Sequence, residues 1–250
     1  MSDGKNRVSV ITICKNAQAL IRQTILSVTG QTYQEIEYII VDGQSSDDTA
    51  NIVFDYIDKI DTYICEPDHG IYDAMNKGIE KATGDWLCFM NAGDTFAHKN
   101  VVNDVFSNDA GYNGKMVIYG DFATSDAHSI VRASEIAVIK HRMPFCHQSV
   151  FLRNKGFCFR TDLQIASDYA LFYDIYREYG SSAFFYTECI IAVFDKSGIS
   201  VNNLKLLYKE YYKLHIEHKE YLYGFYYLIM SCCRNIKHRL FPASKMQGLS

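Results

Sequence analysis

Acidic, amide and lysine side chains gather in two neighbouring stretches of the sequence, residues 66–78 and 86–94. The first stretch, EPDHGIYDAMNKG, places Asp73 and Lys77 at the start of an expected helix, and both helix N-termini and lysines bind phosphate. The second is an apolar run that ends in NAGD, so Asp94 follows an expected buried strand. Because Mg²⁺ and Mn²⁺ prefer carboxylate oxygens, the two stretches together predict a site for a diphosphate and a divalent cation.

Each candidate side chain also has a structural interpretation that the sequence leaves open. Asp73 also suits the first turn of a helix, and Asp94 also suits a turn that it stabilises itself. Asp42 either accepts a hydrogen bond from a nucleotide base or ribose, or binds its own turn. A lone histidine such as His147 is more often structural than functional. Asp168, at an expected helix start, is either a general base or an acid that complements the helix dipole.

The elements that must position these side chains alternate along the first ninety residues. Strands are expected at 8–14, 36–41, 62–65 and 86–90, and helices at 17–29, 50–57 and 72–82. Such alternation is typical of βαβ units and predicts an α/β fold with a mostly parallel, Rossmann-like central sheet flanked by helices. Ligands bind at the carboxyl ends of such strands, where Asp42, the 66–73 loop and Asp94 fall.

The remainder of the chain predicts more strands, followed by a helical tail. Strands are expected at 116–122, 136–139, 144–152 and 183–194, and helices at 101–106, 167–179 and 201–241. Ser46 and Ser167 are the expected N-caps of the helices that follow them.

Composition bounds the class of protein. The chain has 250 residues, 48% of them hydrophobic, with a formal net charge of -4, which argues against a nucleic-acid-binding surface. None of its eight cysteines forms a C-x-x-C pair, so a structural zinc site is not expected. The short polar segment 1–7 is not a secretory signal, and we expect a cytoplasmic protein.

Seven pieces of the chain, in order, resemble the family 2 inverting glycosyltransferases, which have the nucleotide-binding GT-A fold. Residues 8–16 resemble the family's opening strand and turn, and VDGQSSDDT at 41–49 resembles its V-D-G-x-S-x-D-x-T signature. A subgroup found in capsule, exopolysaccharide and O-antigen clusters, including colanic-acid-type enzymes, is similar at 66–78, 91–94, 119–121, 147–149 and 166–169. The resemblance covers about residues 8–200.

The resemblance implies transfer of a sugar, with inversion, from a nucleotide sugar to a hydroxyl of a saccharide acceptor in bacterial surface polysaccharide biosynthesis. The expected donor is a UDP-sugar. Asp168 would be the general base, Asp94 the ligand of a Mn²⁺ or Mg²⁺ ion, and His147 and Gln148 part of the acceptor side. The residues expected to bind the donor are Asn16, Asp42, Ser45, Asp73, Lys77 and Asn91.

One segment departs from the family pattern. Many members have D-x-D-D where this chain has NAGD, so Asp94 is the only acid there. More of the cation's ligands are therefore expected to come from the diphosphate and water. We expect a glycosyltransferase domain at 1–200, with a donor half at about 1–122 and an acceptor half at about 123–200, and a helical extension at 201–250.

The helical extension contains the aromatic run YLYGFYYLIMSCC at 221–233, followed by Arg234, Lys237 and Arg239. The run is shorter than the ~20 residues that span a membrane. Aromatic residues beside a basic cluster favour contact of 221–241 with an anionic membrane surface, while packing on the domain and a homodimer contact stay open. With the acceptor on a polyprenyl diphosphate that the family implies, this contact would place the protein on the inner face of the plasma membrane.

Two other classes of protein remain open from the sequence. A nucleotidylyltransferase-like α/β enzyme usually has a Gly-rich, basic loop after its first strand, and ICKNA at 13–17 lacks one. A non-catalytic partner subunit of the same fold would bind the donor without turnover.

Overall fold

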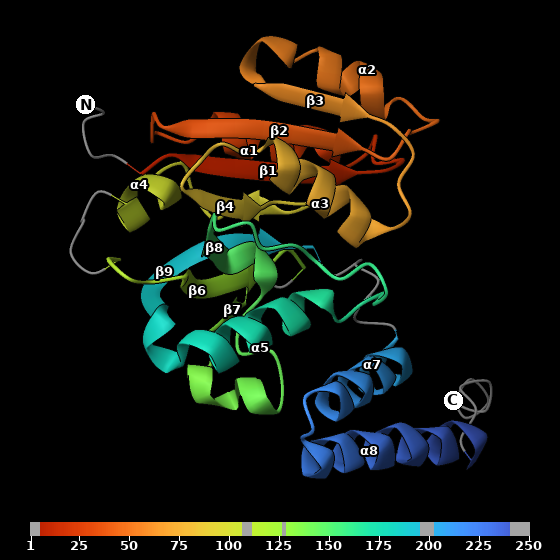
Figure 1. The fold of residues 1–250 in the computed structure, drawn as a ribbon. Helices are drawn as coiled ribbons and strands as arrows, with labels where there is room; N and C mark the ends of the chain where they lie inside the picture. Colours follow the sequence, from red (N-terminus) through yellow and green to blue (C-terminus); the bar gives the residue numbers. More distant parts are fainter. Residues whose placement is uncertain (1–5, 107–111, 127–128, 196–202, 241–250) are drawn as a thin grey trace. The chain divides into compact units, whose positions relative to one another are not determined.

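The computed structural model describes residues 6–106, 112–126, 129–195 and 203–240, of which 231–240 are described by their backbone alone. The chain divides into two compact units, residues 1–196 and 197–250. The first unit is built on a nine-stranded sheet, and the described part of the second is a pair of helices (Figure 1).

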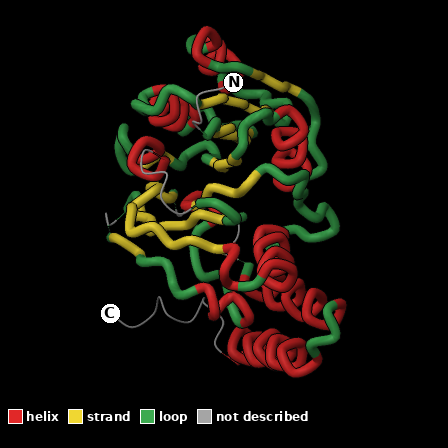
Figure 2. The backbone as a smooth tube through the Cα atoms, turned by 60° about the vertical axis from the view of Figure 1, so that its left-hand side comes forward, coloured by secondary structure: helices red, strands yellow, loops and turns green. Residues whose placement is uncertain are grey.

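The N-terminal half of the sheet is parallel, in the order β3-β2-β1-β4. All seven residues of β1 are buried, as expected of a central strand covered on both faces. The expected strands are confirmed, and Figure 2 shows helices flanking the strands. The strands are β1 (Val8–Cys14), β2 (Ile36–Asp42), β3 (Thr62–Cys65) and β4 (Trp86–Phe89), and the helices are α1 (Ile21–Thr29), α2 (Thr49–Phe54), η1 (Ile57–Lys59) and α3 (Ile71–Lys81).

The second half of the sheet mixes directions and continues in the order β4-β8-β6-β9-β5. Strand β8 runs antiparallel to β4 and β6, β6 and β9 are parallel, and β5 closes the order antiparallel to β9. These elements are β5 (Thr95–Phe96), α4 (Val101–Phe106), β6 (Val117–Thr124), β7 (Ile130–Val131), η2 (Ile136–Lys140), η3 (His147–Ser149), β8 (Val150–Arg153), α5 (Ser167–Tyr179), η4 (Ser181–Ala183) and β9 (Phe184–Phe194).

Several local predictions were wrong. The expected strand at 136–139 is the 3-10 helix η2, and the two-residue strands β5 and β7 were not predicted, because so short a segment shows no periodicity. Ser46 is not an N-cap: α2 begins after Asp48, and the backbone N–H of Ser46 donates to Asn16 Oδ1 instead. Ser167 is the first residue of α5 and makes no capping bond, because Ala166 holds the cap position.

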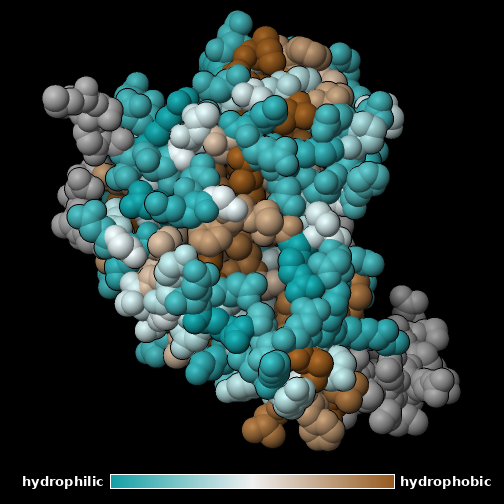
Figure 3. Space-filling model, viewed as in Figure 1, coloured by the Kyte–Doolittle hydropathy of each residue, from teal (hydrophilic) through white to brown (hydrophobic). Residues whose placement is uncertain are grey.

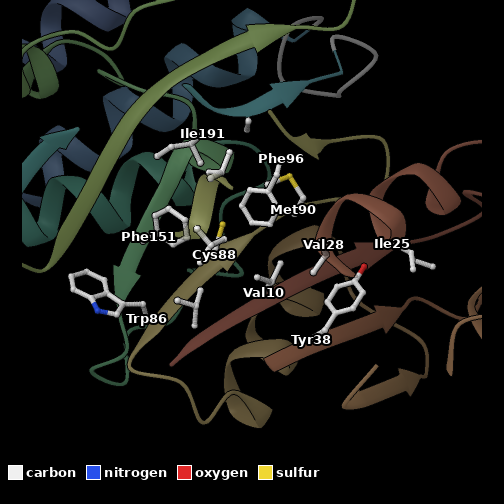
Figure 4. Packing of buried hydrophobic residues seen from close by; sticks show 14 of the residues in the cluster. Val10, Ile25, Val28, Tyr38, Trp86, Cys88, Met90, Phe96, Phe151 and Ile191 are labelled. Carbon is white, nitrogen blue, oxygen red and sulfur yellow. The ribbon is translucent and has the colours of Figure 1, made fainter. Parts of the chain in front are cut away.

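Aromatic and branched aliphatic side chains fill the space between the sheet and its helices (Figure 4). Trp86 and Val10 come from β4 and β1, Phe151 from β8 and Ile25 from α1, so one core cluster joins both halves of the sheet. Helix α3 lies very close to the sheet at Gly78, where a Cβ atom would stand 2.5 Å from Ile11 Cγ2.

The second unit consists, in its described part, of α7 (Leu204–Glu217) and α8 (Tyr221–Leu240). His215 is fully buried, and its Nδ1 lies 2.7 Å from Oε2 of Glu220, next to the start of α8. Among the described helices, none is both long and apolar enough to cross a membrane.

Candidate active site

The loop after β2 is held together by three of the predicted donor-binding residues. Asp42 is fully buried, and its Oδ1 accepts hydrogen bonds from the backbone N–H of Ser45 at 2.8 Å and from its hydroxyl at 2.6 Å. The Tyr63 hydroxyl donates to Oδ2 of Asp42, and the Asn16 N–H donates to Ser45 Oγ. These contacts fix the carboxyl ends of β1, β2 and β3 relative to one another.

The loop between β3 and α3 packs directly on that group. A Cβ atom at Gly43 would stand 1.9 Å from Asp68 Oδ2, so any other residue there would displace the Asp68 carboxylate. Lys15 Nζ lies 3.9 Å from Asp68 Oδ1. The strand ends that the sequence expected to meet therefore lie at one edge of the sheet.

Lys77, a predicted phosphate-binding residue, is surrounded by oxygen atoms of its own loop. Its Nζ lies 3.1 Å from Glu66 Oε1 and 3.5 Å from Asp73 Oδ2, and it donates to the Pro67 carbonyl oxygen. The His69 N–H donates to Asp73 and holds the pKa of that carboxyl below its usual value. A phosphate at Lys77 would thus compete with three oxygen partners.

A second group of polar side chains surrounds the turn that follows β4. The Asp94 N–H donates to the Asn91 carbonyl oxygen, and Asp94 is only 4% exposed. Gln148 Nε2 donates to Asp94 Oδ2, and the Asp195 N–H donates to Oδ1, both at 2.9 Å. Burial raises the pKa of Asp94 to about 6, against the lowering effect of the Asp195 N–H, His147 and Gln148.

His147 lies between this turn and the start of α5. Its Nε2 is 3.3 Å from Asn91 Nδ2, and its Nδ1 is 3.4 Å from Asp168 Oδ2. The Asn91 amide nitrogen only donates, so this contact is a hydrogen bond in the neutral tautomer of His147 whose ring proton is on Nδ1, facing Asp168. The Tyr72 hydroxyl, from α3, donates to Asp168 Oδ1 at 3.3 Å. The side chains of His147 and Asp168 are 21% and 20% exposed, so the pair remains accessible to a ligand.

Two buried polar atoms in this group have no hydrogen-bond partner among the described residues, namely Asn91 Oδ1 and Ser167 Oγ. Such atoms are rare in folded proteins and point to a missing polar partner. Asp94 and the Asn91 amide both offer oxygen atoms that could act as ligands of a hard divalent cation. In the described part of the chain, no three His, Cys, Asp or Glu residues gather as a cation site. The residues present therefore fit a cation that takes its other ligands from a diphosphate and water.

The structure places the predicted site residues in two groups, which we name by their strands. The β1–β3 group contains Asn16, Asp42, Ser45, Asp73 and Lys77, and the β4 group contains Asn91, Asp94, His147, Gln148 and Asp168.

Two residues of the site were not predicted. Tyr72 directly precedes Asp73 and binds Asp168, so it links the two groups. Asp195 follows an apolar strand just as Asp94 does, and that signal in the sequence could have found it.

Comparison with known proteins gives a family and a fold. The profile of Glycosyl transferase family 2 matches residues 9–155. A PGL/p-HBAD biosynthesis glycosyltransferase of Mycobacterium bovis is 28% identical over 149 residues, which are 58% of this chain and 58% of that protein. The chain thus matches little more than half the length of this curated relative.

Solved glycosyltransferase structures share the fold at low sequence identity. S. aureus TarS 1-349 in complex with UDP-GlcNAc is similar with a TM-score of 0.67 at 16% identity, over 84% of this chain and 66% of that one. The mannosyltransferase PcManGT from Pyrobaculum calidifontis, in complex with GDP-Man and Mn²⁺, is similar with a TM-score of 0.65 at 18% identity, over 97% and 78% of the two chains. The expected GT-A fold is confirmed.

Proposed function

The chain belongs to glycosyl transferase family 2, and on that basis we propose that it transfers a sugar, with inversion, from a UDP-sugar to a hydroxyl of a saccharide acceptor. The observation that carries the proposal is the position of Asp168, which lies outside the matched segment 9–155 yet meets the turn after β4 through His147. A partly exposed carboxylate beside the expected diphosphate site is where a single displacement needs its base.

In this mechanism Asp168 accepts the proton of the acceptor hydroxyl as the oxygen attacks the anomeric carbon from the face opposite the leaving UDP. The Nδ1–H of His147 and the hydroxyl of Tyr72 hold the Asp168 carboxylate on two sides and fix its orientation. With Asn91 as the donor to His147 Nε2, the neutral histidine would carry its proton on the side of Asp168.

The donor would lie along the carboxyl ends of the strands, with its nucleotide at the β1–β3 group and its diphosphate near Asn91 and Asp94. UDP-GlcNAc in the TarS structure supports a UDP-sugar as donor. Mn²⁺ in the PcManGT structure supports a divalent cation held by Asp94, and such a cation, when bound, stabilises the charge of the leaving diphosphate. Asp42, Ser45 and Asn16 would act by keeping the nucleotide loop in shape.

A lipid-linked acceptor would bring the enzyme to a membrane surface, and α8 has a suitable face. Leu222, Phe225 and Ile229 recur at helical spacing and are 88%, 61% and 44% exposed. Figure 3 shows apolar side chains in the α8 region. In the sequence, Arg234, Lys237 and Arg239 follow, a composition that suits an anionic leaflet. We place this contact on the cytoplasmic face of the plasma membrane, with the acceptor on a polyprenyl diphosphate in surface polysaccharide synthesis.

The experiment is a panel of nucleotide sugars assayed with MnCl₂ for nucleotide release, thermal stabilisation and product configuration by proton NMR. One UDP-sugar should raise the melting temperature and release UDP faster when saccharide acceptors are added. The product should have the anomeric configuration opposite to that of the donor. Retention of configuration would contradict the inverting mechanism. Preference for a GDP-sugar would contradict the proposal that the donor is a UDP-sugar.

A further inference from the structure

Gly93 occupies a position in the turn after β4 where no other side chain fits without strain. Its φ is +107°, in the region that favours glycine. A Cβ atom there would stand 3.2 Å from Asp195 Oδ2 and 3.4 Å from Leu20 Cδ1. The backbone conformation of the turn therefore disfavours an acid at this position, where many family members have one, and the carboxylate of Asp195 lies next to it.

The sheet brings another acid to the same place. Strands β5 and β9 pair antiparallel, with Thr95 opposite Val193 and Phe96 opposite Ala192. Continuing this register past the end of both strands sets Asp195 opposite Gly93. The Asp195 N–H donates to Asp94 Oδ1 at 2.9 Å, which ties the two segments together beyond the last strand pair.

We propose that Asp195 supplies the second carboxylate of the cation site at Asp94, from across the sheet, in place of the acid that Gly93 excludes. The inference rests on the proposed function, because it deepens the assignment of a cation to the same turn. Asp94, Asp195 and the unpartnered Asn91 Oδ1 all offer oxygen atoms as metal ligands. Mg²⁺ and Mn²⁺ prefer such oxygen ligands, together with those of phosphate.

The electrostatics favour a cation at this point. Asp94 is buried, and Asp195 brings a second negative charge close to it. A divalent cation would neutralise both and would leave its remaining positions to diphosphate oxygens and water.

The test measures Mn²⁺ binding to the full chain by electron paramagnetic resonance of free MnCl₂, with and without UDP. Asp195→Asn keeps the shape of the side chain and the N–H that binds Asp94. It should weaken Mn²⁺ binding ~10-fold or more, as expected for loss of a ligand or its direct support. The matched control is Glu188→Gln, on the exposed side of the same strand, and it should bind Mn²⁺ as the wild type does.

Asp94→Asn separates this inference from the proposed function. If Asp94→Asn loses Mn²⁺ while Asp195→Asn binds it with unchanged affinity, the role of Asp195 is wrong and the cation at Asp94 stands. If neither variant changes binding, the cation site itself is misplaced. Melting temperatures in EDTA check that both variants fold, and MnCl₂ should raise that of Glu188→Gln more than that of Asp195→Asn.

Discussion

At the scale of single residues, Asp94 holds a carboxylate where water scarcely reaches it. Burial raises its pKa from 3.8 to about 6, although Gln148 and the Asp195 N–H both donate to it. A carboxyl whose pKa is raised by folding favours the folded state while it is protonated. That contribution is present below the unfolded pKa and is lost as the pH rises through about 6.

We therefore expect Asp94→Asn to remove part of the pH dependence of stability in metal-free protein. In EDTA, the unfolding free energy of the wild type should fall relative to that of Asp94→Asn between pH 4 and pH 7, by up to about 3 kcal/mol. Urea unfolding at several pH values measures this difference in unfolding free energy. The control is Asp55→Asn, which replaces an exposed carboxylate. Parallel stability curves for the wild type and Asp94→Asn would show that burial does not perturb this carboxyl.

At the scale of elements, the side-chain amide of Asn76 joins helix α3 to the segment before α5. Asn76 Nδ2 donates to the Phe159 carbonyl oxygen at 2.8 Å, and Asn76 Oδ1 accepts the Phe159 N–H at 2.7 Å. The same helix carries Tyr72, whose ring stacks on Phe159 and whose hydroxyl binds Asp168. Asn76 thus fixes the distance between the donor loop and the proposed base.

Replacing Asn76 by Ala should lower the unfolding free energy by ~2 kcal/mol, because it removes two hydrogen bonds and leaves both Phe159 backbone groups without them. It should also lower kcat, since Tyr72 and Asp168 lose their common support. Urea unfolding and steady-state kinetics measure the two effects. Asn51→Ala removes an exposed amide of α2 that donates to Asp48 at the start of the same helix, and it should change neither by much. An equal loss of stability in both variants would contradict the special role of Asn76.

The sequence predicted the parallel strands and their acidic ends because β-branched runs and turn residues are local signals. Asp42 and Asp94 were found because Asp42 ends such a run and Asp94 lies in the polar turn that follows another. Tyr72 was missed because its importance depends on Asp168, 96 residues later in the chain. Asp195 also follows an apolar strand, but its place beside Asp94 depends on a contact across 101 residues. The same limit explains β5, whose two residues form a strand only because β9 lies beside them.

At the scale of the whole molecule, the second unit carries the proposed contact with a lipid surface. Replacing Leu222 and Phe225 by Ser, or Arg234, Lys237 and Arg239 by Glu, should abolish co-sedimentation with vesicles that contain phosphatidylserine. Changing Lys205 and Lys209 of α7 to Glu controls for a general change of charge, and this variant should still sediment with the vesicles.

The competing explanation of the α8 face is a second copy of the chain. Sedimentation velocity of the same variants distinguishes the two. If the Ser variant changes the oligomeric state and leaves vesicle binding intact, the face is a dimer contact and the membrane proposal is wrong.

The measurement that tests the central claim most directly is sugar transfer by Asp168→Asn, set beside its affinity for UDP. The variant keeps the shape of the side chain but has no basic carboxylate, so kcat should fall at least ~100-fold while the Kd for UDP stays within about twofold. Asp162→Asn, an exposed acid outside the site, should transfer at the wild-type rate. Transfer by Asp168→Asn at the wild-type rate would contradict the assignment of the base, and a wild-type chain that binds UDP but transfers no sugar would be a non-catalytic partner subunit.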